Sequence, residues 1–171
     1  MTDLMTAMVL AAGKGTRMKS DLAKVLFPLE GRALVHHVLD AVEGAGFDRA
    51  VAIVGHQHER VREALKNRRV EFVLQEQQLG TGHAVSRAAP LLEGYEGDVA
   101  VLAGDAPLIR AATLRELMGH HRRRDAVVTV LTAVLPDAAD ALHRTRVGLA
   151  LALADLARLR YRMLTELGAS I

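Results

Sequence analysis

The order of apolar and polar stretches along the chain predicts strands that alternate with helices. Apolar runs without internal alternation are typical of strands that are buried on both faces of a sheet, and they occur at 7–12, 50–54, 70–74 and 98–103. A β-branched run at 126–134 predicts a fifth strand. Apolar residues recur at threes and fours between the strands, which predicts helices over 32–45, 57–66, 83–89 and 111–121.

This alternation predicts an α/β fold, with a Rossmann-like, doubly wound and mainly parallel sheet. In such sheets, ligands bind at the carboxyl ends of the strands. Three loops with unusual polar chemistry follow predicted strands, at 13–24, 75–82 and 104–107. We therefore expect these three loops to meet at one edge of the sheet and to form one site.

The chain changes character after Pro136. No strand is predicted beyond residue 134, and apolar residues at threes and fours over 147–167 predict one long amphipathic helix. Gly168 is expected to end this helix. We therefore divide the chain into an α/β domain at 1–136 and a helical tail at 137–171.

Composition excludes several classes of function. The 171 residues carry 22 basic and 20 acidic side chains, and a net charge of +2 does not favour a nucleic-acid partner. The absence of cysteine excludes disulfides, thiol nucleophiles and cysteine-ligated zinc. The first ten residues carry Asp3 and no basic residue, so they make a poor secretion signal, and no apolar stretch is long enough to span a bilayer. We expect a cytoplasmic protein without a membrane partner.

The loop at 13–24 has the chemistry of a phosphate site. It opens with Gly13 and Gly15, which leave backbone N–H groups open to close approach because they lack a Cβ. It also carries three separated cations, Lys14, Arg17 and Lys24. Oriented N–H groups and fixed positive charges together offset the charge of a polyphosphate. The loop therefore predicts a nucleotide-phosphate site.

Two common phosphate motifs fit this loop poorly. The P-loop pattern is not met, because Thr16 follows Gly15 where a lysine is required. The dinucleotide fingerprint is half met, since Met18 replaces its third glycine and no acidic residue ends the strand at 50–54. Two glycines alone are a weak signal, so the type of nucleotide site depends on the rest of the chain.

Three sequence blocks carry a resemblance to a known family. They read LAAGKGTRMKSDLAKVL at 10–26, LQEQQLGTGHAV at 74–85 and GDAPL at 104–108. Residues 8–108 resemble the N-terminal uridylyltransferase domain of the bacterial bifunctional N-acetylglucosamine-1-phosphate uridylyltransferase / glucosamine-1-phosphate acetyltransferase. The first and third blocks occur in looser forms across sugar-phosphate nucleotidyltransferases, whereas the middle block is more specific to the uridylyltransferase.

The resemblance implies transfer of a uridylyl group from UTP to N-acetylglucosamine 1-phosphate, which gives UDP-N-acetylglucosamine and pyrophosphate. The acceptor phosphate itself attacks, so catalysis rests on positioning and on charge neutralisation. Arg17 suits the β- and γ-phosphates, and Lys24 suits the α-phosphate, so we expect both to be catalytic. Asp105 suits Mg²⁺, which prefers carboxylate and phosphate oxygens.

The same resemblance implies the residues that bind the nucleotide. Gln75, Gly80 and Thr81 suit the edge of the uracil ring, because an amide can donate and accept hydrogen bonds at once. The residues expected to line the nucleotide or to flank the metal are Leu10, Ala11, Ala12, Gly13, Ala103 and Gly104.

The sequence also departs from the family. Ala23 stands where the family usually has proline, and Phe27 where it commonly has histidine. After the fifth strand, the Gly-Tyr-Gly segment, the acceptor-binding glutamate and asparagine, and a second metal ligand are not found. The region 147–171 resembles the linker helix of the family, and we expect neither acetyltransferase activity nor the trimer that the acetyltransferase domain builds in the family. These departures predict a truncated or internally deleted relative with impaired turnover.

Three functional hypotheses therefore stay open. The first is a uridylyltransferase-type domain that binds UTP and Mg²⁺. The second is another sugar-phosphate nucleotidyltransferase with a different base or acceptor. The third is a catalytically impaired nucleotide-binding fragment or interaction module.

Overall fold

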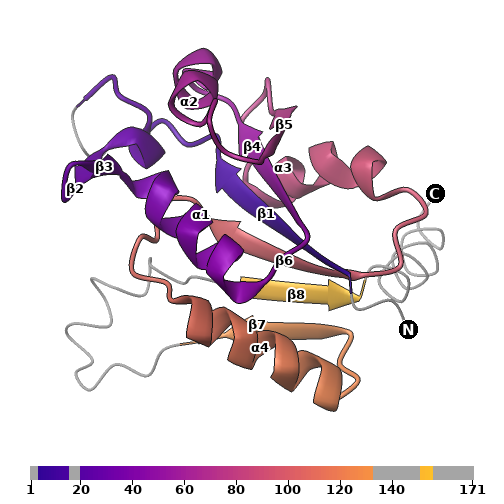
Figure 1. Ribbon diagram of the computed structural model, residues 1–171. Coiled ribbons are helices and arrows are strands. Elements are labelled where there is room, and N and C mark those ends of the chain that lie inside the picture. The colour runs from indigo at the N-terminus through magenta and orange to yellow at the C-terminus, as the bar shows by residue number, and fades with distance from the viewer. Residues whose placement is uncertain (1–3, 16–19, 133–150, 156–171) are drawn as a thin grey trace, which may run out of the picture.

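The computed structural model describes residues 4–15, 20–132 and 151–155, and a six-stranded sheet lies at its centre (Figure 1). Along the sheet the strands follow the order β5 (Glu71–Leu74), β4 (Arg49–Val54), β1 (Met5–Ala11), β6 (Asp98–Ala103), β8 (Leu151–Asp155) and β7 (Val128–Leu131). The helices are α1 (Leu34–Ala45), α2 (His58–Ala64), α3 (Thr81–Ala88) and α4 (Ala111–Arg123), with 3₁₀ turns η2 (Lys24–Leu26) and η3 (Ala89–Leu92). A separate hairpin pairs β2 (Pro28–Leu29) with β3 (Arg32–Ala33).

The pairing of the strands confirms the predicted fold class. β1 pairs in parallel with both β4 and β6, and β4 pairs in parallel with β5. The strands and helices predicted up to residue 134 are present in the order expected, with shifts at their ends. Because β1, β4, β5 and β6 run in the same direction, the loops that follow them leave from one edge of the sheet.

Helices cover both faces of the sheet, as Figure 1 shows for α1 and α4 on one face and α3 on the other. Side chains of β1 alternate between these two layers: Val9 packs in the core on the side of α1 and α4, whereas Met8 packs with Ala84 of α3. A fully buried side chain of this kind contributes about 1.5–3 kcal/mol. The two apolar layers therefore fix β1 in the middle of the fold and its carboxyl end at the loop edge.

The prediction for the region after residue 134 was wrong over part of its length. Residues 151–155 do not belong to a helix but form β8, which pairs antiparallel with β6 on one side and with β7 on the other. The sequence Leu-Ala-Leu-Ala-Asp at 151–155 alternates with the period of a strand as well as fitting a helical stripe. Strand pairing satisfies the backbone groups along the edge of β6, which local helix propensity cannot do.

The remainder of the predicted C-terminal helix, at 147–150 and 156–167, lies outside the described residues. The division of the chain at residue 136 therefore stays a prediction. Within the described ranges, no helix combines the length and the apolar character that a membrane crossing requires.

Candidate functional site

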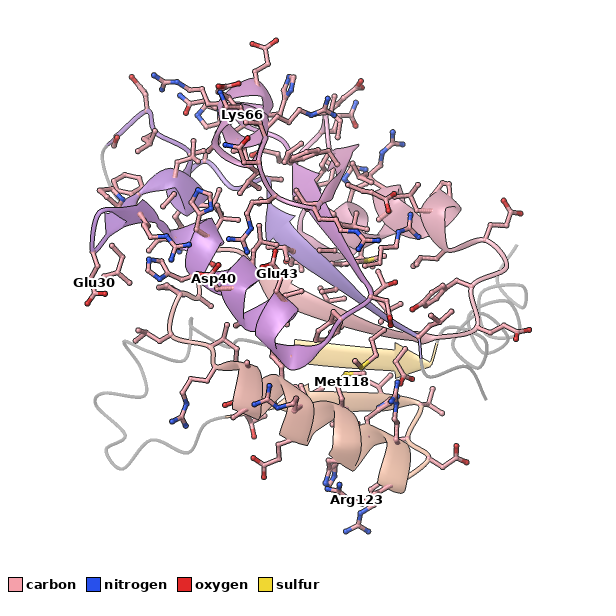
Figure 2. All side chains as sticks on the ribbon, viewed as in Figure 1. Glu30, Asp40, Glu43, Lys66, Met118 and Arg123 are labelled. Atoms are coloured by element: carbon pink, nitrogen blue, oxygen red, sulfur yellow. The ribbon has the colours of Figure 1, made fainter. Side chains whose placement is uncertain are left out.

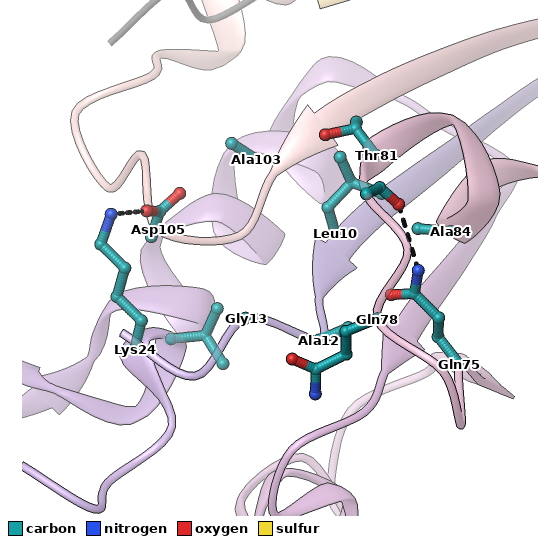
Figure 3. Close-up of a pocket in the computed structure, with 12 residues that line it drawn as sticks. Leu10, Ala12, Gly13, Lys24, Gln75, Gln78, Thr81, Ala84, Ala103 and Asp105 are labelled. Atoms are coloured by element: carbon teal, nitrogen blue, oxygen red, sulfur yellow. Dashed lines mark hydrogen bonds and ion pairs between the residues drawn. The ribbon is translucent and has the colours of Figure 1, made fainter. Parts of the chain in front are cut away.

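A cavity of about 330 Å³ opens at the carboxyl ends of β1, β5 and β6 (Figure 3). Its volume is in the range of small-molecule sites, and its position agrees with the rule for parallel α/β sheets. The residues that line it are Leu10, Ala12, Gly13, Lys24, Val25, Gln75, Gln78, Gly80, Thr81, Ala84, Ala103 and Asp105. The three loops that the sequence singled out thus meet at one place.

Most of the predicted site residues line this cavity, and two do not. Ala11 is fully buried in the core on the side of α1, because alternate residues of β1 face opposite sides of the sheet. Gly104 lies beside the cavity and donates its N–H to the carbonyl oxygen of Leu10 over 2.9 Å. A Cβ at Gly104 would meet this same oxygen at 2.7 Å, so this glycine serves the packing of β6 against β1. Arg17 lies outside the described residues.

Three lining residues were missed from the sequence, namely Gln78, Val25 and Ala84. Gln78 carried a usable signal, since it is an amide in the most specific of the three blocks. Val25 and Ala84 are buried apolar residues, and nothing in their sequence context separates them from ordinary core positions.

Lys24 and Asp105 form an ion pair at the cavity, which Figure 3 marks between the two loops. Both side chains keep contact with solvent, with exposed fractions of 44% and 26%. A cation beside a carboxylate can attract a phosphate and a divalent cation, respectively. The site thus holds one charge of each sign within reach of the same ligand.

The position of Lys24 is set by residues that follow β4. The backbone N–H of Ala23 donates to Oε1 of Gln57 over 3.0 Å, and a ring nitrogen of His56 lies 3.1 Å from the carbonyl oxygen of Asp21. Gln57, the residue immediately before α2, adopts a left-handed conformation with φ of 52°. These contacts join the loop that precedes Lys24 to the loop that follows β4, although the two loops are distant in sequence.

Gly15 also acts on the position of Lys24. Its φ of +65° favours glycine, and a Cβ at this position would meet Cβ of Lys24 at 3.0 Å. The glycine of the first block therefore has a steric reason in this structure, besides the backbone access that the sequence suggested.

Gln75 is the buried polar residue of the site, with 3% of its surface exposed. Its Nε2 donates to the carbonyl oxygen of Gly80 over 3.1 Å and lies 3.0 Å from Nδ1 of His83. Its backbone N–H donates to the carbonyl oxygen of Val54 over 2.7 Å, which continues the pairing of β4 with β5. The amide group is therefore held from several sides.

Helix α3 begins at the wall of the cavity. Gly80 precedes it with φ of 106°, and no side chain caps the first turn. The first N–H groups of a helix have no partner inside the helix and carry partial positive charge. Because Gly80 and Thr81 line the cavity, this helix end offers hydrogen-bond donors beside the amide of Gln75.

The residues of the cavity fit a divalent cation that arrives with a polyphosphate. Among the described residues, no group of three acidic, histidine or cysteine side chains could form a preformed metal centre. Mg²⁺ is commonly held by one or two carboxylates together with phosphate oxygens and water. Asp105, the acidic residue of the cavity lining, supplies such a carboxylate.

Fold and site together define an α/β protein with a cavity of small-molecule size at the carboxyl ends of its parallel strands. The sequence pattern of the MobA-like NTP transferase domain matches residues 7–169, and the chain belongs to this family. The predicted resemblance is confirmed as well: the chain is 52% identical over 129 residues to the bifunctional protein GlmU of Trichormus variabilis. The match covers 75% of this chain and 29% of that protein, so the chain spans less than a third of the curated relatives it matches.

Solved structures agree with this assignment. A nucleotidyl transferase from Methanothermobacter thermautotroptrophicus has a TM-score of 0.62 and 29% identity, over 70% of this chain and 58% of that one. Rv0371C of Mycobacterium tuberculosis H37Rv, in complex with manganese, has a TM-score of 0.58 and 26% identity, over 74% of this chain and 63% of that one. Family membership and these neighbours support a role in nucleotidyl transfer.

Proposed function

We propose that this chain is a uridylyltransferase-type domain that binds UTP together with a divalent cation at the cavity. The observation that carries the proposal is the convergence of Lys24, Asp105 and Gln75 on one cavity, at the start of α3. A cation, a carboxylate and a buried amide are the groups that a phosphate, a metal and a base require, respectively. The similarity to bifunctional GlmU proteins supports uridine as the base.

The proposed reaction joins the phosphate of N-acetylglucosamine 1-phosphate to the α-phosphorus of UTP and releases pyrophosphate. An oxygen of the acceptor phosphate forms the new P–O bond, and the bond between the α- and β-phosphates breaks. Lys24 neutralises charge on the α-phosphate, and Arg17, outside the described residues, is proposed to act on the β- and γ-phosphates.

Asp105 would hold the divalent cation, which when bound offsets the charge of the phosphates. A structural neighbour of this chain is a manganese complex, which supports a divalent metal, and we propose Mg²⁺ for this chain. The ion pair with Lys24 holds the carboxylate of Asp105 at the cavity.

Gln75, Gly80 and Thr81 are proposed to bind the uracil, while Leu10, Ala12 and Gly13 lie along the nucleotide. We further propose a cytoplasmic location and no nucleic-acid or membrane partner, on the charge balance of the sequence. Ala11 and Gly104 are proposed to support the nucleotide site through packing, since Ala11 is buried and a Cβ at Gly104 would meet the backbone oxygen of Leu10.

A second candidate is a nucleotide-binding fragment with impaired turnover. One observation favours it: the acceptor-binding residues of the family are not found after β7. A nucleotidyltransferase for another base or sugar is a third candidate, which the block at 74–85 disfavours.

Two measurements on the full chain separate these candidates. Calorimetric titration with UTP, CTP, ATP and GTP in the presence of Mg²⁺ tests the nucleotide, and we expect UTP to bind most tightly. Release of pyrophosphate from UTP and N-acetylglucosamine 1-phosphate tests turnover. Tight UTP binding without release supports the impaired fragment, whereas a preference for another nucleotide supports the third candidate. Absence of binding to all four nucleotides overturns the proposal.

A further inference from the structure

The orientation of the Gln75 amide follows from its partners. The carbonyl oxygen of Gly80 can only accept a hydrogen bond, so the atom that faces it at 3.1 Å must be the amide nitrogen. Figure 3 marks this hydrogen bond with a dashed line from the nitrogen of Gln75 and shows the amide oxygen on the other side of the group. A flipped amide would set two acceptors against each other, so the assignment is fixed by chemistry.

The second N–H of this amide is directed to His83. Nε2 of Gln75 lies 3.0 Å from Nδ1 of His83, and it can donate there only if Nδ1 carries a lone pair. In this hydrogen bond Nδ1 of His83 is therefore the acceptor and carries no proton. His83 is half-buried and does not line the cavity, so it acts on the site through Gln75.

With both N–H groups engaged, Gln75 presents only an acceptor to a ligand. Within the described residues, Oε1 of Gln75 accepts no hydrogen bond, and it is not among the buried polar atoms that lack a partner. Since Gln75 lines the cavity and is otherwise buried, this oxygen opens to the cavity.

The acceptor lies next to donors. Gly80 and Thr81 bring the uncapped first turn of α3 to the same wall, where backbone N–H groups are free of helical partners. An acceptor beside donors complements a ring edge on which an N–H adjoins a carbonyl, as in an imide. A ring nitrogen with a lone pair, as in cytosine, would face Oε1 as one acceptor against another.

We propose that His83 is a positioning residue that sets the base selectivity of this site. The lone pair on Nδ1 of His83 holds the amide of Gln75 so that Oε1 faces the cavity, and the site then selects a base with an imide edge over one with a ring-nitrogen acceptor. This inference rests on the proposed nucleotide function and adds to it a residue outside the cavity.

Two substitutions at one position separate the hydrogen bond from the bulk of the ring. His83→Asn places Oδ1 on Cγ, where Nδ1 stands, and keeps an acceptor. His83→Leu introduces a side chain with a similar branch at Cγ but without a hydrogen-bond acceptor. Arg87→Leu, at an exposed position of α3, controls for a change on this helix.

The ratio of the UTP and CTP dissociation constants is measured for each full-length variant in Mg²⁺ by calorimetry. The wild type, His83→Asn and Arg87→Leu are expected to favour UTP by similar ratios. His83→Leu is expected to lower the preference by about three- to tenfold, the size of one lost hydrogen bond. An unchanged ratio in His83→Leu, or an equal loss in His83→Asn, overturns the proposal.

A second measurement needs no ligand. Long-range ¹H–¹⁵N spectra of the imidazoles, with His83→Asn to assign the signal, report which ring nitrogen of His83 carries the proton. A protonated Nε2 and a bare Nδ1 support the inference, and a proton on Nδ1 overturns it, even if His83→Leu does not fold. If neither nucleotide binds, the proposed function fails and base selection with it, while the spectrum still decides whether the hydrogen bond exists.

Discussion

Lys24 and Asp105 form an ion pair across the cavity, although they follow different strands of the sheet. A pair that keeps contact with solvent contributes only about 0–1 kcal/mol, so a ligand can open it at little cost. In the proposed complex, the phosphates take Lys24 and the divalent cation takes Asp105. The pair therefore holds both side chains at the cavity without locking them together.

Asp105→Asn is expected to remove the dependence of UTP affinity on Mg²⁺, because an amide is a poor ligand for this ion. Calorimetric titration with and without Mg²⁺ measures it, and we expect the wild-type gain from Mg²⁺ to fall at least about tenfold, a change of roughly 1.4 kcal/mol. Asp40→Asn is the matched control, since Asp40 lies on α1 (Figure 2), pairs with Arg32 and Arg68, and does not line the cavity. An equal response to Mg²⁺ in both variants would contradict the metal assignment.

Lys24→Met is expected to weaken UTP binding about tenfold and to flatten its dependence on salt, because it removes a phosphate contact and keeps the apolar stem. Lys66→Met is the control, since Lys66 pairs with Glu63 on the surface. Titrations at two ionic strengths check the prediction. Equal salt dependence of both variants would count against a phosphate role for Lys24.

The hydrogen bond from Ala23 to Gln57 is expected to couple the two residues energetically. Ala23 has φ of −54° and ψ of 132°, a conformation that proline adopts, but proline has no N–H to donate to Oε1. Gln57→Ala should cost about 1 kcal/mol in the wild type and less after Ala23→Pro. Urea unfolding of the two single variants and the double variant gives the coupling.

A double-mutant cycle is needed because Gln57→Ala also changes a left-handed residue, at a cost common to both backgrounds. Strict additivity in the cycle would show that the hydrogen bond does not hold the loop beneath Lys24. A measurable coupling would show that this chain uses a hydrogen bond from Ala23 to Gln57 at the position where the family usually has proline.

Gly104→Ala is expected to destabilise the fold by at least about 1 kcal/mol, because its Cβ would meet a backbone oxygen of Leu10 that cannot move aside. Gly13→Ala is the matched control, since no atom lies within 4 Å of the Cβ it would add. Thermal and urea unfolding of the two variants measure the difference. Similar losses of stability in both would refute the packing role of Gly104.

The ion pair of Arg49 and Glu71 is expected to make the free energy of unfolding depend on pH in the acid range. Two hydrogen bonds from Arg49, at 2.6 and 2.7 Å, lower the pKa of Glu71 below its ordinary value of 4.5. A lowered pKa in the folded state gives stability that is present above pH 4.5 and is lost as the pH falls through the lowered value. Glu71→Gln should flatten the acid side of the stability curve, as followed by urea unfolding between about pH 6 and 3. Glu93→Gln, on an exposed loop, should leave it as in the wild type.

Much of the fold could be predicted because strands buried on both faces are continuous apolar runs. The end of β1 shows the limit of this signal. The apolar run there contains Leu10, Ala11 and Ala12, but neighbouring residues of a strand face opposite sides of the sheet, so Leu10 and Ala12 line the cavity and Ala11 lies in the core. The resemblance of a block to a family does not say which of its residues face the ligand.

Contacts between loops could not be predicted from the sequence, for a different reason. The bond between Gln75 and His83 depends on two side-chain conformations, and the bond between Gln57 and Ala23 joins residues whose proximity exists only after the sheet has formed. The strand β8 was missed because its alternating leucine and alanine residues suit a helix and a strand equally, and pairing with β6 and β7 decides between them.

The place of β8 between β6 and β7 also sets an order of events during synthesis. β7 has no direct pairing with β6, so it cannot join the sheet until residues 151–155 have left the ribosome. Until then, the edge of β6 carries open hydrogen-bonding groups, the kind of edge on which another chain can assemble. The late arrival of one short strand thus leaves the nascent chain open to association with its neighbours on the polysome until β8 pairs with β6.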